Sequence, residues 1–379
     1  MAPKKLLCVF TTLLGHATVT QRFMRALNRM PGIEPTYVLV GAEDFERYRA
    51  PWWMRATEPW RGQFIARRKA EPLFRQKFDM LLVNAWEFAV AFRDLAHGMP
   101  AIAAMDAIPA TFYNQRRQNV RFGIARWISH QLYHRSFGRA AREFDLFLPK
   151  SSTCARALRE QHEIPAGRCF VTLAPQFLET WKPVSKPPSS RLQLLFAGND
   201  FRRKGGEFLL RLFSERLAGH CTLTIASNDR SLTGRQFPDG VRLLQGQGRD
   251  ALIPLYGQHD LFVFPTQQDF TPEVVAEALA TGMPCLATEV DGIRDLILDS
   301  VNGYVMPPHA PIDSWAEPIL SLAANPGELR RMSVNARKFA EAELDFERFE
   351  ELLAGVIHRL AVPDPAAETP EWALSAGVA

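Results

Sequence analysis

Ten short apolar runs, each of four to six residues, recur along the chain with amphipathic stretches between them. The runs are rich in aliphatic and β-branched residues and end at turn or polar residues, which is the pattern of buried parallel strands. The first five are Leu6–Phe10, Thr36–Val40, Met80–Val83, Ala101–Met105 and Leu146–Pro149. The other five are Leu192–Ala197, Leu223–Ala226, Val241–Leu244, Leu261–Phe264 and Pro284–Ala287. This alternation predicts the α/β class, with parallel sheets covered by helices on both faces.

Between the two sets of strands lies a segment that neither a helix nor an inner strand can accommodate. Residues 183–190 hold three prolines and three serines, which predicts a linker. Helical spacing marks residues 18–30 and 151–161, and Ser151 can cap the second helix. The predicted organisation is an N-terminal domain (1–182), the linker (183–190), a C-terminal domain (191–345), a last helix (346–362) and a disordered tail (363–379).

The composition is that of a globular protein in a reducing compartment. The 379 residues are enough for two domains, with 47% hydrophobic and 23% charged residues. The five cysteines are scattered and odd in number, which argues against a disulfide framework or a zinc site. We expect no signal peptide, because the apolar run after Lys5 is short, and no run approaches the ~20 residues of a membrane span. These features predict a cytoplasmic protein.

The loop after the strand Leu192–Ala197 has the character of an anion site. Gly198 allows the chain to turn, and Arg202, Arg203 and Lys204 follow just before Gly205 and a helix. Cations next to the free N–H groups of a helix N-terminus bind phosphate. A solvated basic turn remains the alternative interpretation, since such loops are common.

A second polar loop follows the strand Leu261–Phe264. It carries Asp269, and a helix predicted to start near Pro272 carries Glu277. Because they are eight positions apart, both carboxylates can point into one cleft. Glu277 could instead be a surface glutamate of the helix, but its apolar neighbours, such as Leu279, weaken that alternative.

A third acidic residue follows a strand of the first half. Asp106 comes directly after Met105 and shortly before Pro109. In open parallel sheets, ligands bind beyond the carboxyl ends of the strands, which makes Asp106 a candidate for the site. The alternative interpretation is a helix cap.

Taken together, these spaced residues resemble the family-4 retaining glycosyltransferases of the GT-B fold. The motifs of the second half are Gly198…Arg203-Lys204-Gly205, Asp269-x7-Glu277-Ala-Leu-Ala-x-Gly-x-Pro284, Asp291-Gly-Ile-Arg-Asp-Leu-Ile297 and Asn302-Gly-Tyr-Val305. Residues 192–345 are closely similar to the family. The first half is more loosely similar, through Gly15-His16, Asp106–Pro109 and the strand into Ser151. The fold that this implies is two Rossmann-like domains facing each other across a cleft.

The activity that the resemblance implies is transfer of a hexose from a UDP- or GDP-linked sugar (EC 2.4) with retention of configuration. The acceptor would be a saccharide or a lipid-linked saccharide of cell-envelope or polysaccharide biosynthesis. Two alternatives stay open, namely a small soluble acceptor and a non-catalytic relative that only binds the nucleotide sugar. No metal or other cofactor is expected, because no Asp-x-Asp motif follows a strand.

The resemblance also assigns roles to residues. Arg203, Lys204 and the helix N–H groups near residues 271–273 would stabilise the leaving diphosphate electrostatically. Glu277 would bind the ribose and Asp269 the donor sugar, while Gly15 would allow close approach to the diphosphate. The predicted catalytic residues are Asp106, Arg203, Lys204 and Asp269. The predicted donor-binding residues are Gly15, Gly198, Asn199, Arg203, Lys204, Asp269, Phe270, Thr271, Pro272, Glu273 and Glu277.

The chain departs from the family pattern at three of these positions. The family motif begins with Glu where this chain has Asp269, which is one methylene shorter. Asn199 stands where the family often has Arg, so Arg202 or Arg203 must supply the second cation. Many members have His where this chain has Asp106.

Two segments of the first half combine cations with aromatic residues. Residues 52–77 contain Trp52, Trp53, Arg55, Trp60, Arg61, Phe64, Arg67, Arg68, Lys69, Phe74, Arg75 and Lys77. Residues 115–142 contain Arg116, Arg117, Arg121, Phe122, Arg126, Trp127, Arg135, Arg139 and Arg142. They predict peripheral contact with an anionic membrane, at the inner face of the plasma membrane. The alternative is a solvated basic face over a core of aromatics. Nucleic-acid binding is disfavoured, because it leaves the motifs of the second half unexplained.

Overall fold

The chain forms two compact units. The structure, a computed structural model, describes residues 2–13, 15–49, 58–111, 124–184 and 189–361. Unit 1 comprises residues 1–172 together with the C-terminal part from Phe349, and unit 2 comprises Leu173–Arg348. Each unit has its own hydrophobic core. The α/β fold with two parallel-sheet domains, predicted from the alternation of apolar runs, is confirmed.

Unit 1 is built on five parallel strands in the order β2-β1-β3-β4-β5. Its strands are β1 (Lys4–Thr11), β2 (Ile33–Val40), β3 (Met80–Val83), β4 (Ala101–Met105) and β5 (Leu146–Pro149). Its helices are α1 (His16–Arg29), α2 (Ala42–Arg47), α3 (Glu58–Ala70), α4 (Trp86–Ala91), α5 (Arg93–Gly98), α7 (Ile124–Ala141) and α8 (Ser152–His162), with 3₁₀ turns at Glu71–Arg75 and Ala166–Arg168. The inner strands β3, β4 and β5 are buried along their whole length.

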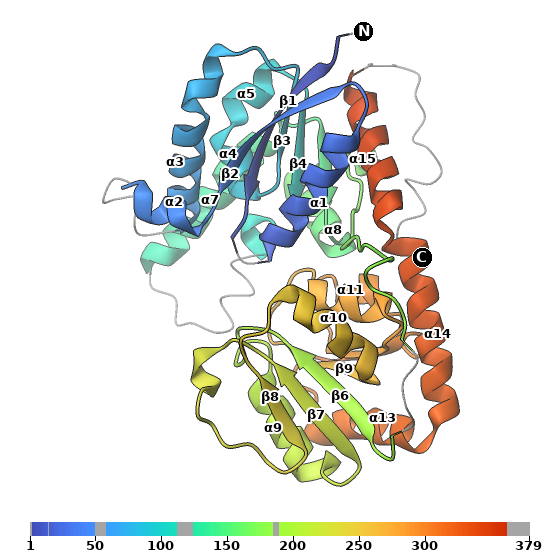
Figure 1. The fold of residues 1–379 in the computed structure, drawn as a ribbon. Coiled ribbons are helices and arrows are strands. Elements are labelled where there is room, and N and C mark those ends of the chain that lie inside the picture. The colour runs from blue at the N-terminus through green and yellow to red at the C-terminus, as the bar shows by residue number, and fades with distance from the viewer. Residues whose placement is uncertain (1, 14, 50–57, 112–123, 185–188, 362–379) are drawn as a thin grey trace. The chain divides into compact units, whose positions relative to one another are not determined.

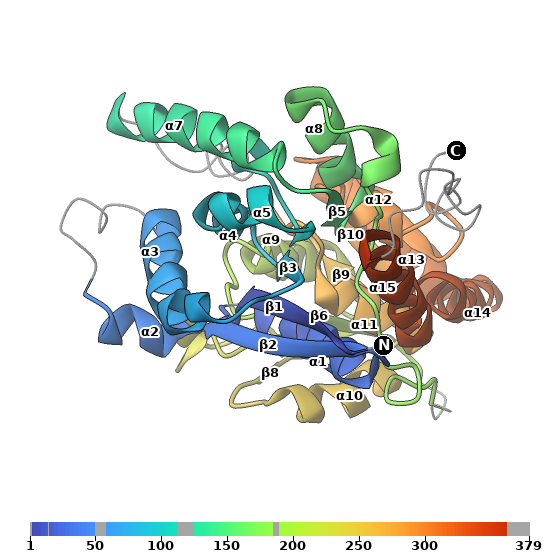
Figure 2. The same cartoon turned by 90° about the horizontal axis from the view of Figure 1, so that it is seen from above.

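The helix α7 lies outside a layer of other helices. α4 packs against β3 and β4 on one side and against α3 and α7 on the other. Figure 2 shows α7 at the periphery of unit 1, beyond α4 and α5. One side of α7 therefore has no helix over it among the described residues, and Ile128 and Leu132 on it are 47% and 46% exposed.

The last helix, α15 (Phe346–Ala361), belongs mostly to unit 1. Phe349 meets Phe23 of α1 edge to face, with ring centroids 5.1 Å apart. Glu350 pairs with Arg29 at 3.4 Å, and the Arg359 guanidinium lies over the Phe170 ring. The chain thus returns at its end to the helix that follows its first strand.

Unit 2 is built on six parallel strands in the order β11-β10-β9-β6-β7-β8. Its strands are β6 (Leu192–Ala197), β7 (Cys221–Ala226), β8 (Val241–Leu244), β9 (Leu261–Phe264), β10 (Cys285–Thr288) and β11 (Gly303–Met306). Its helices are α9 (Gly206–Leu212), a π-helical turn at Phe213–Leu217, a 3₁₀ turn at Arg230–Leu232, α10 (Arg249–Gln258), α11 (Glu273–Ala280), α12 (Ile293–Leu296), α13 (Ile312–Ala324) and α14 (Pro326–Glu343). Helices cover both faces of the sheet (Figure 1).

The predicted strands agree with the observed ones except at their ends and at β11. β2 begins three residues before the predicted Thr36 and includes Pro35. Proline is tolerated there because β2 is an edge strand with one neighbour, so the sheet needs no N–H group from Pro35 for a second strand. β11 carries no strong strand signal, since it has four residues and begins with glycine. A Cβ on Gly303 would lie 2.0 Å from the Cys285 carbonyl oxygen, so the close pairing with β10 requires this glycine.

Within the described residues, no helix has both the length and the hydrophobicity to cross a bilayer.

Candidate functional site

The two strands that carry the anion-site residues are neighbours at the centre of the unit 2 sheet. The chain runs from β6 outward to β7 and β8, then returns to β9 and proceeds the other way to β10 and β11. The strand order therefore reverses between β6 and β9, and such reversal points are where open α/β sheets bind ligands. The loops 198–205 and 265–272 follow these two strands.

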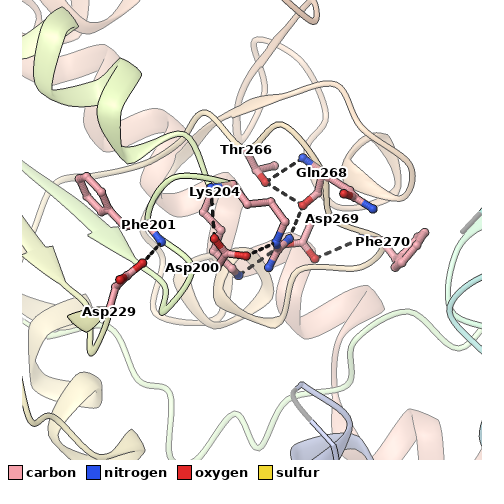
Figure 3. A network of polar contacts seen from close by, with 9 residues as sticks. Asp200, Phe201, Lys204, Asp229, Thr266, Gln268, Asp269 and Phe270 are labelled. Atoms are coloured by element: carbon pink, nitrogen blue, oxygen red, sulfur yellow. Dashed lines mark hydrogen bonds and ion pairs between the residues drawn. The ribbon is translucent and has the colours of Figure 1, made fainter. Parts of the chain in front are cut away.

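An ion pair joins these two loops. The Lys204 ammonium lies 3.3 Å from Oδ2 of Asp269 (Figure 3). It also lies 5.0 Å from the centroid of the Phe264 ring. Both charged side chains are about four-fifths buried, with 17% and 18% exposed. A Cβ on Gly198 would lie 2.4 Å from Cδ of Lys204, so the lysine side chain runs directly over this glycine. The structure thus brings together three predicted site residues, Gly198 and Lys204 from the loop after β6 and Asp269 from the loop after β9.

Backbone contacts fix the approach of the loops. Gly205 has φ +80°, a conformation that favours glycine, and a Cβ there would lie 1.8 Å from the Pro265 carbonyl oxygen. The Gln267 amide donates to the Arg203 carbonyl at 2.9 Å. No side chain larger than hydrogen is therefore compatible with this geometry at position 205.

The structure distinguishes between the two arginines that could supply a second cation. Nε of Arg203 donates to Asp200 at 2.7 Å, Nη1 donates to the Gln268 carbonyl, and Nη1 lies 3.9 Å from Asp269. Arg202 is exposed. Arg203 is thus the arginine beside Lys204 and Asp269.

The first part of the loop is held in place by the neighbouring strand end. The Asn199 amide oxygen accepts from the Asn228 backbone N–H at 3.0 Å, and Asp229 accepts from the Phe201 N–H at 2.9 Å (Figure 3). Hydrogen bonds from Ser231 and from the Phe201 amide lower the pKa of the Asp229 carboxyl. Asn199 therefore connects the loop to the segment after β7.

The loop after β9 leads directly into α11. The Phe270 amide donates to Asp269 at 3.1 Å, and the Phe270 carbonyl accepts from the Gly292 amide at 2.9 Å. Pro272 has extended backbone and is the N-cap of α11, so the helix begins at Glu273. A proline at the first helical position would have placed the start one residue earlier, at Pro272 itself. Thr271 precedes this cap, and Glu273 accepts from Gln176 at 3.2 Å.

Glu277 is buried, as its apolar neighbours predicted. Its residue is 5% exposed, and Val275–Ala280 around it are all buried. The Tyr256 hydroxyl donates to Oε2 of Glu277 at 3.0 Å. Tyr256 could not be predicted from the sequence as a partner of Glu277. It belongs to a helix before β9, and no sequence motif connects the two positions.

In unit 1, two residues that carry the family resemblance, His16 and Asp106, lie close together. Nε2 of His16, after β1, lies 3.4 Å from Oδ2 of Asp106, after β4. Their side chains are 20% and 25% exposed. Gly15 has ordinary helical backbone angles and a Cβ there would meet nothing within 4 Å, so its predicted role in approaching a diphosphate stays a prediction. His16 and Asp106 are ninety positions apart, so the sequence alone could not predict that they lie next to each other.

The cations that α3 contributes to the first basic segment are engaged within unit 1, whereas Arg75 and Lys77 after it are exposed. Arg67 forms a bidentate ion pair with Asp94. Arg68 forms an ion pair with Glu71, and Lys69 forms one with the buried Asp44. The aromatic residues Trp60 and Phe64 pack against the core. These contacts favour the second interpretation of the segment, in which its cations form a surface over aromatic residues of the core. A cationic patch that is free to bind a membrane fits these residues less well. Trp52, Trp53, Arg55, Arg116, Arg117, Arg121 and Phe122 lie outside the described residues, as do the side chains of Arg126 and Trp127.

The second basic segment, by contrast, keeps exposed cations on α7 and just after it. Arg135, Arg139 and Arg142 are exposed and follow Ile128 and Leu132 at spacings of three and four residues. That spacing places Ile128, Leu132, Arg135 and Arg139 on one side of α7, and Arg142 follows in the turn after it. We call this set the α7 stripe.

Among the described residues, no three His, Cys, Asp or Glu side chains gather closely enough to hold a metal ion.

Comparison with known proteins identifies the type of domain in unit 2. Residues 191–325 match the family model of Glycosyl transferases group 1. D-inositol 3-phosphate glycosyltransferase from Xylanimonas cellulosilytica is 35% identical over 89 residues, which are 24% of this chain and 21% of that protein. This chain thus aligns with about a fifth of the length of that relative. The resemblance inferred from the spaced motifs is confirmed by the family match.

Solved structures show that the fold extends over both units. Sucrose-phosphate synthase from Thermosynechococcus elongatus superposes with a TM-score of 0.78 at 13% identity, covering 95% of this chain and 100% of that one. HepE from Anabaena, solved in complex with UDP, superposes with a TM-score of 0.70 at 13% identity, covering 94% and 100%. At such low identity the likeness concerns the fold, which is of the predicted GT-B type.

Gly205→Ala should destabilise the protein far more than Gly219→Ala. Both glycines have positive φ, +80° and +87°, but only Gly205 faces a backbone atom, whereas nothing lies within 4 Å of a Cβ at Gly219. The alanine at 219 should cost about 1–2 kcal/mol through its backbone conformation alone. The alanine at 205 should cost several kcal/mol more, because the loops must separate. Urea unfolding of the two variants measures the difference, and equal losses would contradict the close approach.

Proposed function

We propose that this chain, whose residues 191–325 form a group 1 glycosyltransferase domain, is a retaining, metal-independent enzyme that transfers a sugar from a nucleotide sugar. The single observation that supports it most is the Lys204–Asp269 pair with Arg203 beside it, at the point where the strand order reverses. The donor would be a UDP- or GDP-sugar. The acceptor would be a saccharide or lipid-linked saccharide of cell-envelope or polysaccharide biosynthesis.

The two cations account for the departure of the leaving group. Breaking the bond between the anomeric carbon and the diphosphate leaves the electron pair on a β-phosphate oxygen. Lys204 and Arg203, held in place before the reaction, would stabilise this charge without rearrangement, and the first amides of α11 would add to the effect. The proposal therefore needs no metal ion for this step.

The two carboxylates would bind the hydroxyl groups of the donor. Asp269 lies beside both cations, so it would reach a sugar attached to the diphosphate. Glu277 is separated from them along α11 and is buried, which suits a fixed contact with the ribose. Both groups would accept hydrogen bonds from hydroxyls, and neither would form a covalent bond.

Retention of configuration requires the acceptor oxygen to attack on the face that the diphosphate leaves. The new bond joins that oxygen to the anomeric carbon, and the acceptor proton passes to the departing phosphate oxygen. On the acceptor side we assign Asp106 to bind the acceptor hydroxyl, with His16 holding its Oδ2. This assignment extends the predicted catalytic role of Asp106.

The ligand of one similar structure agrees with the proposed donor. HepE from Anabaena, 14% identical, has been solved in complex with UDP-glucose, and other similar proteins are named D-inositol 3-phosphate glycosyltransferases. The UDP-glucose bound to HepE supports a nucleotide-sugar donor for this chain.

For the acceptor, we propose that the α7 stripe brings the enzyme to an anionic membrane at the inner face of the plasma membrane. Residues 1–172 contain 26 Lys and Arg against 14 Asp and Glu, whereas residues 173–379 contain 19 against 27. The positive charge therefore resides in the part of the chain that carries α7. Exposed aliphatic side chains followed by arginines suit the boundary between lipid tails and headgroups.

Purified protein should hydrolyse at least one UDP- or GDP-sugar slowly and transfer its sugar to a saccharide acceptor. Lys204→Ala should lower kcat by ~10²–10³, because one preorganised stabilising group is lost. Lys338→Ala, which removes an exposed lysine of α14, serves as the matched control and should keep full activity. Product release from a panel of nucleotide sugars measures the effect. A Lys204→Ala variant as active as the control would contradict the electrostatic role, and a chain inert to every donor would favour the non-catalytic relative.

Transfer should be insensitive to chelators. Because Lys204 and Arg203 are assigned to the charge that a metal ion neutralises in other transferases, EDTA should leave the rate unchanged. The measurement is the initial rate before and after EDTA, followed by addition of Mg²⁺ or Mn²⁺. Loss of activity in EDTA with recovery on adding either ion would refute the metal-independent mechanism.

The protein should sediment with anionic vesicles, less with neutral ones, and be released at ~1 M salt, where the Debye length falls to ~3 Å. Arg135→Glu/Arg139→Glu should weaken binding at least about 30-fold, since each arginine near an anionic surface contributes ~1 kcal/mol. Arg242→Glu/Arg330→Glu makes the same change of net charge on exposed residues of unit 2 and should have little effect. Equal losses in both variants, or a wild type that ignores anionic vesicles, would favour a small soluble acceptor.

A further inference from the structure

The buried carboxylate of Glu277 has a specific hydrogen-bond donor on a neighbouring helix. The Tyr256 hydroxyl, on α10, donates to Oε2 of Glu277, on α11, at 3.0 Å. Tyr256 is 1% exposed and Glu277 is 5% exposed. The two residues are separated by twenty-one positions in the sequence, and the contact exists only because α10 and α11 meet in the fold.

Packing holds the Tyr256 ring in one position. Trp181 meets it edge to face, with centroids 5.4 Å apart and an interplanar angle of 89°. Phe262 of β9 lies on it at 5.8 Å with an angle of 31°. Trp181 is itself 1% exposed, and its carbonyl accepts from Arg337 at 2.7 Å. A ring enclosed in this way cannot change its rotamer without disturbing the core, so the direction of its hydroxyl is fixed.

The environment of Glu277 makes this hydrogen bond important for the carboxylate. Residues 275–280 are buried, and the neighbours of Glu277 on α11 are valine, alanine and leucine. An ionised group among apolar side chains needs charge-assisted hydrogen bonds to offset its desolvation. A tyrosine hydroxyl has a single proton, so it engages one carboxylate oxygen and directs the plane of the group.

We infer that Tyr256 is a positioning residue for donor recognition, which acts through Glu277 on the ribose. The inference rests on the proposed function, in which Glu277 accepts hydrogen bonds from the ribose hydroxyls. Tyr256 touches no substrate in this account. Its contribution is to keep a flexible glutamate side chain in the one orientation that distinguishes a ribose from a sugar without hydroxyls.

Tyr256→Phe should lower the preference for ribose while leaving other contacts to the nucleotide intact. The variant removes one oxygen and keeps the ring that packs against Trp181 and Phe262. Calorimetric titration should show that the affinity for UDP or GDP falls about tenfold, the usual effect of losing a hydrogen bond to a charged group. The affinity for the corresponding 2′,3′-dideoxynucleoside diphosphate should not change. In kinetics, the KM for the donor should rise while kcat stays within about twofold, because the charge on the diphosphate is stabilised elsewhere.

Tyr133→Phe is the matched control, because Tyr133 is an equally buried tyrosine that lies in unit 1. It should change neither affinity. If Tyr256 had only a structural role, Tyr256→Phe would weaken the ribo- and dideoxynucleotides equally, or neither, and the inference would be overturned. In the Glu277→Gln background, Tyr256→Phe should have no further effect on the ribose preference, and an additive effect would also contradict it. A wild type that binds no nucleoside diphosphate would overturn the proposed function together with this inference, whereas a normal wild type with an unaffected Tyr256→Phe overturns the inference alone.

Discussion

The ion pair between Lys204 and Asp269 is the interaction on which the rest of the candidate site depends. It joins the loops after β6 and β9, and these strands are neighbours although about seventy residues separate them in the chain. Two features of the surrounding backbone make it possible. Gly198 leaves room for the lysine side chain, and Gly205 lets its own loop touch Pro265. Arg203 is then held by Asp200 and the Gln268 carbonyl, so a second cation faces the same carboxylate.

In this arrangement the charged groups of the candidate site are held in place by contacts within the protein. The side chains of Lys204 and Asp269 are each less than one-fifth exposed, which strengthens their attraction relative to an exposed pair. A diphosphate would replace part of the interaction between Lys204 and its carboxylate partner. Electrostatic stabilisation of this kind is effective because the groups do not have to reorganise during the reaction. In the proposed function, the buried Tyr256–Glu277 contact would extend the same principle to the nucleoside.

The sequence predicted most of the fold and part of the site. Strands such as β3, β4 and β9 have the predicted bounds because their apolar runs are short and sharply ended. Asp269 and Lys204 could be predicted as site residues because each lies in a polar segment after a strand. Contacts between residues on separate elements, such as His16 with Asp106 or Tyr256 with Glu277, depend on the order of strands and on helix packing, which local patterns do not contain. The basic residues of α3 show the converse limit, since Asp94 and Asp44 neutralise charges that the sequence alone presents as free.

The central claim is that the carboxyl ends of β6 and β9 in unit 2 bind the diphosphate of a nucleotide sugar. The most direct measurement is an X-ray structure of the protein with UDP or GDP bound. The account predicts that the β-phosphate contacts the Lys204 ammonium and the Arg203 guanidinium and lies near the first amides of α11, with a ribose hydroxyl on Glu277. A nucleotide bound elsewhere, with its diphosphate in contact with neither cation, would contradict it.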